Sequence, residues 1–138
     1  MNRAPLDAAI ISLLETVTSR PVGDSQIPNE NPSFPYVVVY CSPSPRSYEG
    51  SWEDPNDQGS VSYQVKSVGR TRDQVSKLSD RVAEAFVGHE AGKSGYQHPL
   101  VPSGLGVIKR ESVSRGAIMR TGDDLFQCDD FYEIEVSI

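Results

Sequence analysis

The sequence predicts an α+β protein, a two-layer sandwich in which two helices cover a mostly antiparallel sheet of about four strands. Two segments carry apolar side chains at helical spacing. Four further segments have the β-branched and aromatic composition that is typical of strands. The order is helix, strand, strand, helix, strand, strand, and two amphipathic helices can cover one face of such a small sheet.

The composition fits one globular domain over residues 1–138. Domains commonly have about 100–200 residues, and this chain has 138. Hydrophobic residues make up 37% of the chain and charged residues 23%, which is too apolar for a wholly disordered protein. The formal net charge of −6 disfavours direct binding to duplex DNA, because phosphate-binding faces are usually basic.

The two cysteines, Cys41 and Cys128, are far apart and have neither the pattern of a disulfide framework nor metal-ligand spacing. We therefore expect free thiols in a protein that folds in a reducing cytoplasm. The longest apolar run, Tyr36–Cys41, is far shorter than the ~20 residues of a membrane helix. The N-terminus lacks the basic region of a secretion signal.

The N-terminal helix is predicted over residues 4–19. Its apolar side chains form one stripe: Leu6, Ile10, Leu13, Leu14 and Val17. Pro5 suits the first turn, and the helix dipole favours the Asp7 carboxylate there. The proline-rich residues 21–35 that follow are predicted to be a connector with little regular structure.

The first two strands are predicted on either side of a long loop. Tyr36–Cys41 has the composition of a strand buried on both faces. Residues 60–69 alternate apolar and polar side chains, so we expect one wet face and antiparallel pairing with the first strand. The loop between them, residues 42–59, is of a length usually associated with function or mobility.

The second helix is predicted over residues 72–87. Thr71 and Gln74 have the spacing of a capping box at its start, and Gly88 is suited to end it. Its apolar stripe consists of Val75, Leu78, Val82, Ala85 and Phe86.

Two more strands are predicted in the C-terminal part, at 105–114 and 130–138. A polar loop over 88–104 precedes the first of them, and an irregular stretch over 115–129 separates the two. In the last strand, alternation places Tyr132, Ile134, Val136 and Ile138 towards the core.

No motif in the sequence indicates catalytic, cofactor-binding or metal-binding residues, so we expect a protein that is not an enzyme. His89 and His98 lack further clustered ligands. Asp129 and Asp130 are adjacent on a predicted strand and would point to opposite faces, which weakens an acid/base pair. The remaining candidate pair, Asp123 and Asp124, fits a turn.

Charge is unevenly distributed along the chain. Residues 121–138 contain six carboxylates and no Lys or Arg. Residues 66–81 and 109–120 each carry a net charge of +3. This is either ordinary surface patterning or the sign of head-to-tail self-association, in which a basic face meets the acidic face of a neighbour.

Several segments, in their order along the chain, resemble the tail terminator proteins of long-tailed (siphovirus) phages. They are Arg3–Leu14, Arg20–Asp24, Pro35–Tyr40 and above all Tyr63–Gln74. The closest likeness is to terminators of phages that infect actinobacteria, and more distantly the chain is similar to the lambda minor tail protein U group. Residues 42–59 and 88–104 depart most from the family.

The resemblance implies a structural virion protein with a small α/β fold. Members of this family form a six-membered ring that caps the completed tail tube, stops its polymerisation and joins it to the head-to-tail connector. The implied partners are copies of itself, the major tail tube protein and the connector. DNA would pass through the lumen without specific binding, and the net charge of −6 per copy would repel it. The location would be the head–tail junction of the virion, after assembly in the host cytoplasm.

The charge pattern and the resemblance together suggest two contact surfaces. At the subunit interface, basic Arg70, Arg72 and Lys77 of one copy would meet acidic Asp123, Asp124 or Asp129 of the next. Loop 42–59 would contact the tail tube or the connector through Arg46, Tyr48 and Trp52, residue types that dominate interface hot spots.

Two alternatives stay open from the sequence. The first is a neck or head-completion protein of the same junction. The second, from a different class, is a small monomeric ligand-binding or hydrolytic α+β domain that uses the acidic C-terminal segment.

Overall fold

The computed structural model describes residues 3–41, 46–47, 58–89, 92, 95–122 and 124–137. The elements in chain order are α1 (Ala4–Thr18), β1 (Val22–Asp24), β2 (Tyr36–Cys41), β3 (Arg46–Ser47), β4 (Gln58–Gly69), α2 (Arg72–Val87), β5 (Gly106–Arg115), β6 (Met119–Thr121) and β7 (Leu125–Ser137). Neither helix is long and apolar enough to cross a membrane within this part of the chain.

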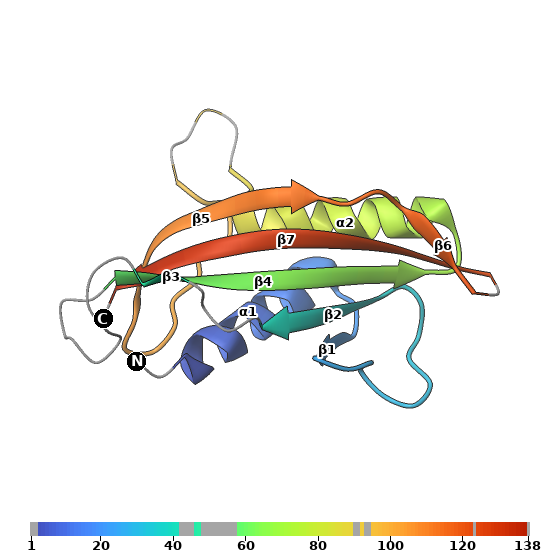
Figure 1. The fold of residues 1–138 in the computed structure, drawn as a ribbon, viewed down its shortest axis with the longest axis horizontal. Coiled ribbons are helices and arrows are strands. Elements are labelled where there is room, and N and C mark those ends of the chain that lie inside the picture. The colour runs from blue at the N-terminus through green and yellow to red at the C-terminus, as the bar shows by residue number, and fades with distance from the viewer. Residues whose placement is uncertain are drawn as a thin grey trace.

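The fold is α+β, with both helices against the same face of one sheet (Figure 1). The sheet has seven described strands, so the expectation of about four was wrong. The strand order is β1-β2-β4-β7-β5, with β3 beside β4 and β6 beside β7. It is a mixed sheet, because β1 runs parallel to β2 while every other described pairing is antiparallel.

The missed strands lie in segments expected to be irregular. β1 falls in the connector over 21–35, β3 in the loop over 42–59, and β6 in the stretch over 115–129. Each has only two or three residues, too few to display alternation. β7 begins at Leu125 rather than at residue 130, because its first residues include half-buried polar side chains that hide the apolar pattern.

The two helices follow the predicted stripes closely. In α1, Leu6, Ile10, Leu14 and Val17 are buried, whereas Leu13 is only partly buried. The bounds and buried apolar residues of α2 are as predicted. Thr71 Oγ1 accepts a hydrogen bond from the Gln74 amide at 3.1 Å, which confirms the N-cap. The Gln74 side chain reaches back to the Arg70 amide, one residue earlier than in the usual capping box.

Gly88 ends α2 for a different reason than the sequence suggested. Its φ of −65° is not left-handed. A Cβ at this position would lie 2.5 Å from the Glu84 carbonyl oxygen, so close backbone approach requires glycine here.

The main core fills the space between the helices and the sheet. Its centre is aromatic: Phe86 of α2 stacks on Tyr132 of β7 at 4.2 Å between ring centroids. Tyr63 of β4 lies beside Phe86, and its hydroxyl donates to Asp7 Oδ1 of α1 at 2.6 Å. Burial and this hydrogen bond raise the pKa of Tyr63, so the phenol stays protonated. One side chain thus links both helices to the sheet.

On the opposite face of the sheet, the described part of the chain forms no helix. Alternation along β4 and β7 sends every second side chain to this side, where β2 packs only a small cluster of Tyr36, Val38 and Val68 beneath Phe34. We call the remainder the helix-free face. It is formed by Gln64 and Lys66 of β4, Asp129, Phe131, Glu133 and Glu135 of β7, and Lys109 and Glu111 of β5.

Replacing the N-cap of α2 tests the local signal that positions this helix. Thr71→Ala removes the hydrogen bond to the Gln74 amide and is expected to lower the free energy of unfolding by about 1 kcal/mol. Thr16→Ala is the matched control, because its hydroxyl bonds only to the Ser12 carbonyl within an exposed part of α1. Urea unfolding monitored by circular dichroism measures both, and equal losses would contradict the assigned cap.

Candidate interaction surfaces

Arg70 and Arg72 lie where β4 ends and α2 begins, and aromatic rings support both guanidinium groups. The Arg70 guanidinium is 4.4 Å from the centroid of Phe34. That of Arg72 is 5.8 Å from the centroid of Phe126. Such contacts contribute about 0.5–1 kcal/mol at exposed sites. They hold both charges at the surface while leaving them able to meet an anion.

The other predicted interface residues have partners within the chain. Lys77 Nζ lies 3.0 Å from Asp73 in α2, and both side chains are exposed. Asp124 lies 3.5 Å from Arg120 across the β6–β7 turn. Exposed pairs of this kind are worth at most about 1 kcal/mol, so a partner chain could replace them at little cost.

The structure brings together some of the residues that were expected to meet between subunits. Gly69 of β4 pairs with Phe126 of β7, so Arg70 and Arg72 lie at the same end of the sheet as Asp124. Lys77 and Asp129 instead lie on opposite sides of the sheet, because Lys77 is on α2 and Asp129 is on the helix-free face. The pairings between subunits themselves stay a prediction.

Four predicted contact residues fall wholly or partly outside the described residues. Asp123, Tyr48 and Trp52 lie outside them, and Arg46 is described only by its backbone in β3.

The helix-free face is rich in carboxylates. Glu111 of β5 lies directly opposite Glu133 of β7 in the register, and Lys109 lies opposite Glu135. Like charges directly opposite each other on a sheet are unfavourable. Lys109 also lies 3.7 Å from Glu111. The carboxylates on this face nevertheless outnumber its two lysines, Lys66 and Lys109, and two of them flank the exposed Phe131 along β7.

A groove of about 300 Å³ lies between the end of α1 and the first turns of α2. Its lining residues are Thr18, Ser19, Arg20, Pro35, Gln74, Lys77, Leu78 and Arg81. We call it the basic groove, because all three of its charged side chains are cations. Arg20 is fixed by hydrogen bonds to the Pro35 carbonyl at 2.7 Å and Ser33 Oγ at 3.0 Å.

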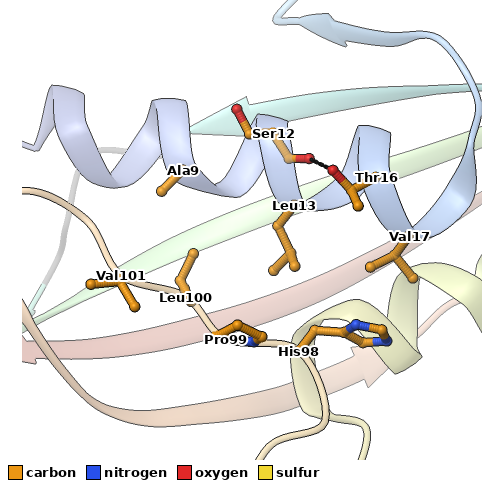
Figure 2. Close-up of a pocket in the computed structure, with 9 residues that line it drawn as sticks. All are labelled: Ala9, Ser12, Leu13, Thr16, Val17, His98, Pro99, Leu100 and Val101. Atoms are coloured by element: carbon orange, nitrogen blue, oxygen red, sulfur yellow. Dashed lines mark hydrogen bonds between the residues drawn. The ribbon is translucent and has the colours of Figure 1, made fainter.

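A second groove, of about 320 Å³, separates α1 from the segment 98–101 (Figure 2). Leu13 and Leu100 point into it from its two sides, and Val101 at its edge is 84% exposed. His98 is the ionisable side chain among its lining residues, and His98 Nε2 lies 3.5 Å from Glu84. This groove is an apolar surface rather than a cluster of reactive groups.

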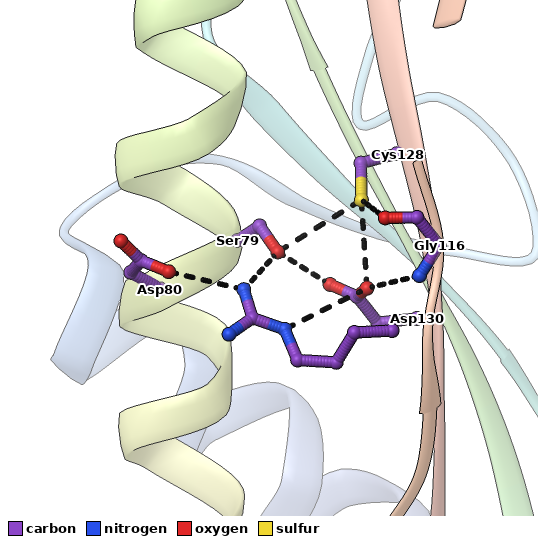
Figure 3. Close-up of polar contacts among 6 residues, drawn as sticks. Ser79, Asp80, Gly116, Cys128 and Asp130 are labelled. Atoms are coloured by element: carbon purple, nitrogen blue, oxygen red, sulfur yellow. Dashed lines mark hydrogen bonds and ion pairs between the residues drawn. The ribbon is translucent and has the colours of Figure 1, made fainter. Parts of the chain in front are cut away.

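Asp130 forms the centre of a buried polar network (Figure 3). It accepts hydrogen bonds from Ser79 Oγ of α2 at 2.6 Å and from the Gly116 amide at 3.1 Å. Arg115 Nη2 donates to Ser79 Oγ at 2.6 Å and to Asp80 at 3.1 Å. The network therefore fastens α2 to the connection between β5 and β6. Sequence reasoning correctly placed Asp129 and Asp130 on opposite faces, but it missed this structural role.

The network also includes Cys128, whose thiol contacts the Gly116 carbonyl at 3.2 Å. Burial, together with the nearby Asp130 carboxylate, raises the pKa of Cys128 to about 11. Burial and Asp7 raise the pKa of Cys41 to about 12. Both cysteines are free thiols, as expected. They stay protonated near neutral pH, which makes them poor nucleophiles.

Comparison with known proteins identifies the fold. No family model matches the chain, and no curated protein matches it. A chain in the virion of a native gene transfer agent particle is 14% identical with a TM-score of 0.63, over 95% of this chain and 93% of that chain. A second solved protein, whose description states no function, is 18% identical with a TM-score of 0.64, over 100% and 97% of the two chains. The likeness at such low identity shows a shared fold.

Two adjacent aspartates of β7 offer a matched test of the network. Asp130→Ala leaves the Ser79 hydroxyl and the Gly116 amide without their acceptor and removes the carboxylate 3.9 Å from Arg115 Nε. We expect it to lower the free energy of unfolding by at least about 2 kcal/mol. Asp129→Ala, one residue away on the helix-free face, should change it by less than about 0.5 kcal/mol. Guanidinium unfolding measures both, and similar effects of the two changes would refute the role of Asp130.

Proposed function

We propose that this chain is a structural protein of a phage-like virion and that it acts as a tail terminator. In this role it forms a ring, with six copies as in the family it resembles, on the completed tail tube. The ring stops polymerisation of the tube protein and offers a surface to the head-to-tail connector. The observation that carries the proposal is the likeness in fold to a gene transfer agent virion chain over nearly the whole of both chains.

We infer that the protein works by assembly and not by catalysis. The polar network around Asp130 joins α2 to the sheet, which is a structural role. The raised pKa values of both thiols favour their inert protonated form. The charged residues that could reach a second molecule lie on open surfaces, which favours contacts with other proteins.

A head-to-tail ring is supported by the distribution of charge over the two sides of the molecule. Basic side chains line the groove between the helices, whereas carboxylates gather on the helix-free face. When two different surfaces of one chain attract each other, repeated docking produces a closed ring if the rotation per copy permits it.

The deciding experiment is deletion of the gene from the phage that encodes the chain. If the chain is a tail terminator, the deletion should produce tails of uncontrolled length that do not join heads, and electron microscopy would show them. Tails of normal length that remain unjoined would instead favour a neck or head-completion protein. Infectious particles with normal tails would overturn both roles.

Reversing one basic charge tests whether assembly depends on this end of the sheet. Arg72→Glu is expected to weaken self-association several-fold at low ionic strength, and the difference should shrink as salt screens the interaction. Arg72→Lys is the control, because it keeps the positive charge at this position. Light scattering at a series of salt concentrations measures both. Unchanged association of Arg72→Glu would exclude a contribution from Arg72.

The predicted contact with the tail tube or connector can be separated from ring formation. Trp52→Ala, alone or with Tyr48→Ala, is expected to leave self-association unchanged but to weaken binding to tail tubes about tenfold or more, as loss of a hot-spot aromatic does. Co-sedimentation with purified tubes measures this. If both binding to tubes and joining to heads stay normal, these aromatic residues have no such role.

A further inference from the structure

We propose that neighbouring copies dock through Phe131, which inserts from the helix-free face of one copy into the basic groove of the next. The inference rests on the proposed function, since it names the surfaces by which copies would assemble. It assigns roles to Phe131 and Arg81, which the sequence did not single out, and it combines an apolar contact with opposite charges.

Phe131 is an unusual residue for its position. It lies on β7, a strand flanked by β4 and β5 in the interior of the sheet, yet it is 41% exposed. Its cross-strand neighbours are the polar Gln64 and Ser114, which do not cover the ring. Asp129 and Glu133, two residues away on either side, point to the same face. The result is an aromatic ring that projects between two carboxylates.

The basic groove has the complementary character. Pro35 and Leu78 supply apolar surface, and the volume of about 300 Å³ is sufficient for an aromatic ring. Arg81 at its edge is exposed and forms no ion pair with any described residue. Lys77, which also lines the groove, lies 3.0 Å from the exposed Asp73 and forms no other ion pair with the described residues. An aromatic ring flanked by carboxylates would therefore find both an apolar surface and cations.

The two surfaces lie on different sides of the molecule, as head-to-tail docking requires. Both described helices lie on one side of the sheet (Figure 1). The basic groove is between them. Phe131 points to the other side, because its neighbour Tyr132 is buried on the helix side. A copy that has used its groove still offers its Phe131. Each contact thus leaves both kinds of surface available for the next copy, which allows a ring.

The first test removes the aromatic ring. Phe131→Asp should weaken self-association of the full chain about tenfold or more, measured by native mass spectrometry and light scattering. Val101→Asp is the matched control, because Val101 is 84% exposed and lies beside the other groove. Circular dichroism melting establishes that both variants are folded. Equal association of wild type, Phe131→Asp and Val101→Asp would overturn the docking mode.

The second test exchanges charges across the contact. Asp129→Lys and Arg81→Glu should each weaken association, and the double variant should recover most of the loss because the ion pair re-forms with reversed polarity. This recovery distinguishes a direct contact from damage to folding. Additive losses in the double variant would overturn the pairing, as would a wild-type chain that stays monomeric at its highest soluble concentration.

Complementation separates this inference from the proposed function. If Phe131→Asp fully restores normal tails to the gene deletion, the docking mode is wrong and the terminator role stands. If the deletion itself leaves tails normal and joined to heads, the proposed function is wrong. The two association tests then decide only whether copies of the chain bind each other through Phe131 and the basic groove.

Discussion

Two helices can cover only one face of this sheet, and that constraint determines both the core and the surface of the molecule. Along β7, Tyr132, Ile134 and Val136 are buried against the helices. The residues between them point the opposite way and meet no helix. A β-strand cannot bury one set of side chains without presenting the other. The set that points away from the helices consists of half-buried carboxylates on either side of the exposed Phe131 ring. We therefore interpret this face as a contact surface.

The sequence-based prediction succeeded where the pattern is long and local. α2 was predicted to the residue because Thr71, the apolar stripe and Gly88 all act within one helix. It failed where structure depends on partners far along the chain. β1 and β6 are strands because they pair with the longer strands β2 and β7. Three residues are too few to show the alternation that would predict a strand. The number of strands in the sheet thus depends on pairing between distant segments, which the composition of each segment alone does not predict.

For the candidate surfaces too, local features were predictable and contacts between distant segments were not. That Asp129 and Asp130 point to opposite faces was predictable from strand geometry. The contact of Asp130 with Ser79 and Gly116 was not predictable, because it joins β7 to α2 and to the connection between β5 and β6, which are far apart in the sequence. Phe131 could have been found, since the alternation that assigned Tyr132 to the core places its neighbour outside. The basic groove requires the packing of α1 against α2 and could not be predicted from either helix alone.

The edge strand β5 has a consequence for a protein that must gather in many copies. Its ladder with β7 shifts register twice, between Val107 and Lys109 and between Ser112 and Ser114. Such bulges twist an edge strand away from the flat geometry that invites a further strand. Open-ended growth by backbone pairing is thereby discouraged at high local concentration. Association is left to side-chain surfaces, which can specify one partner and one angle and so limit the number of subunits.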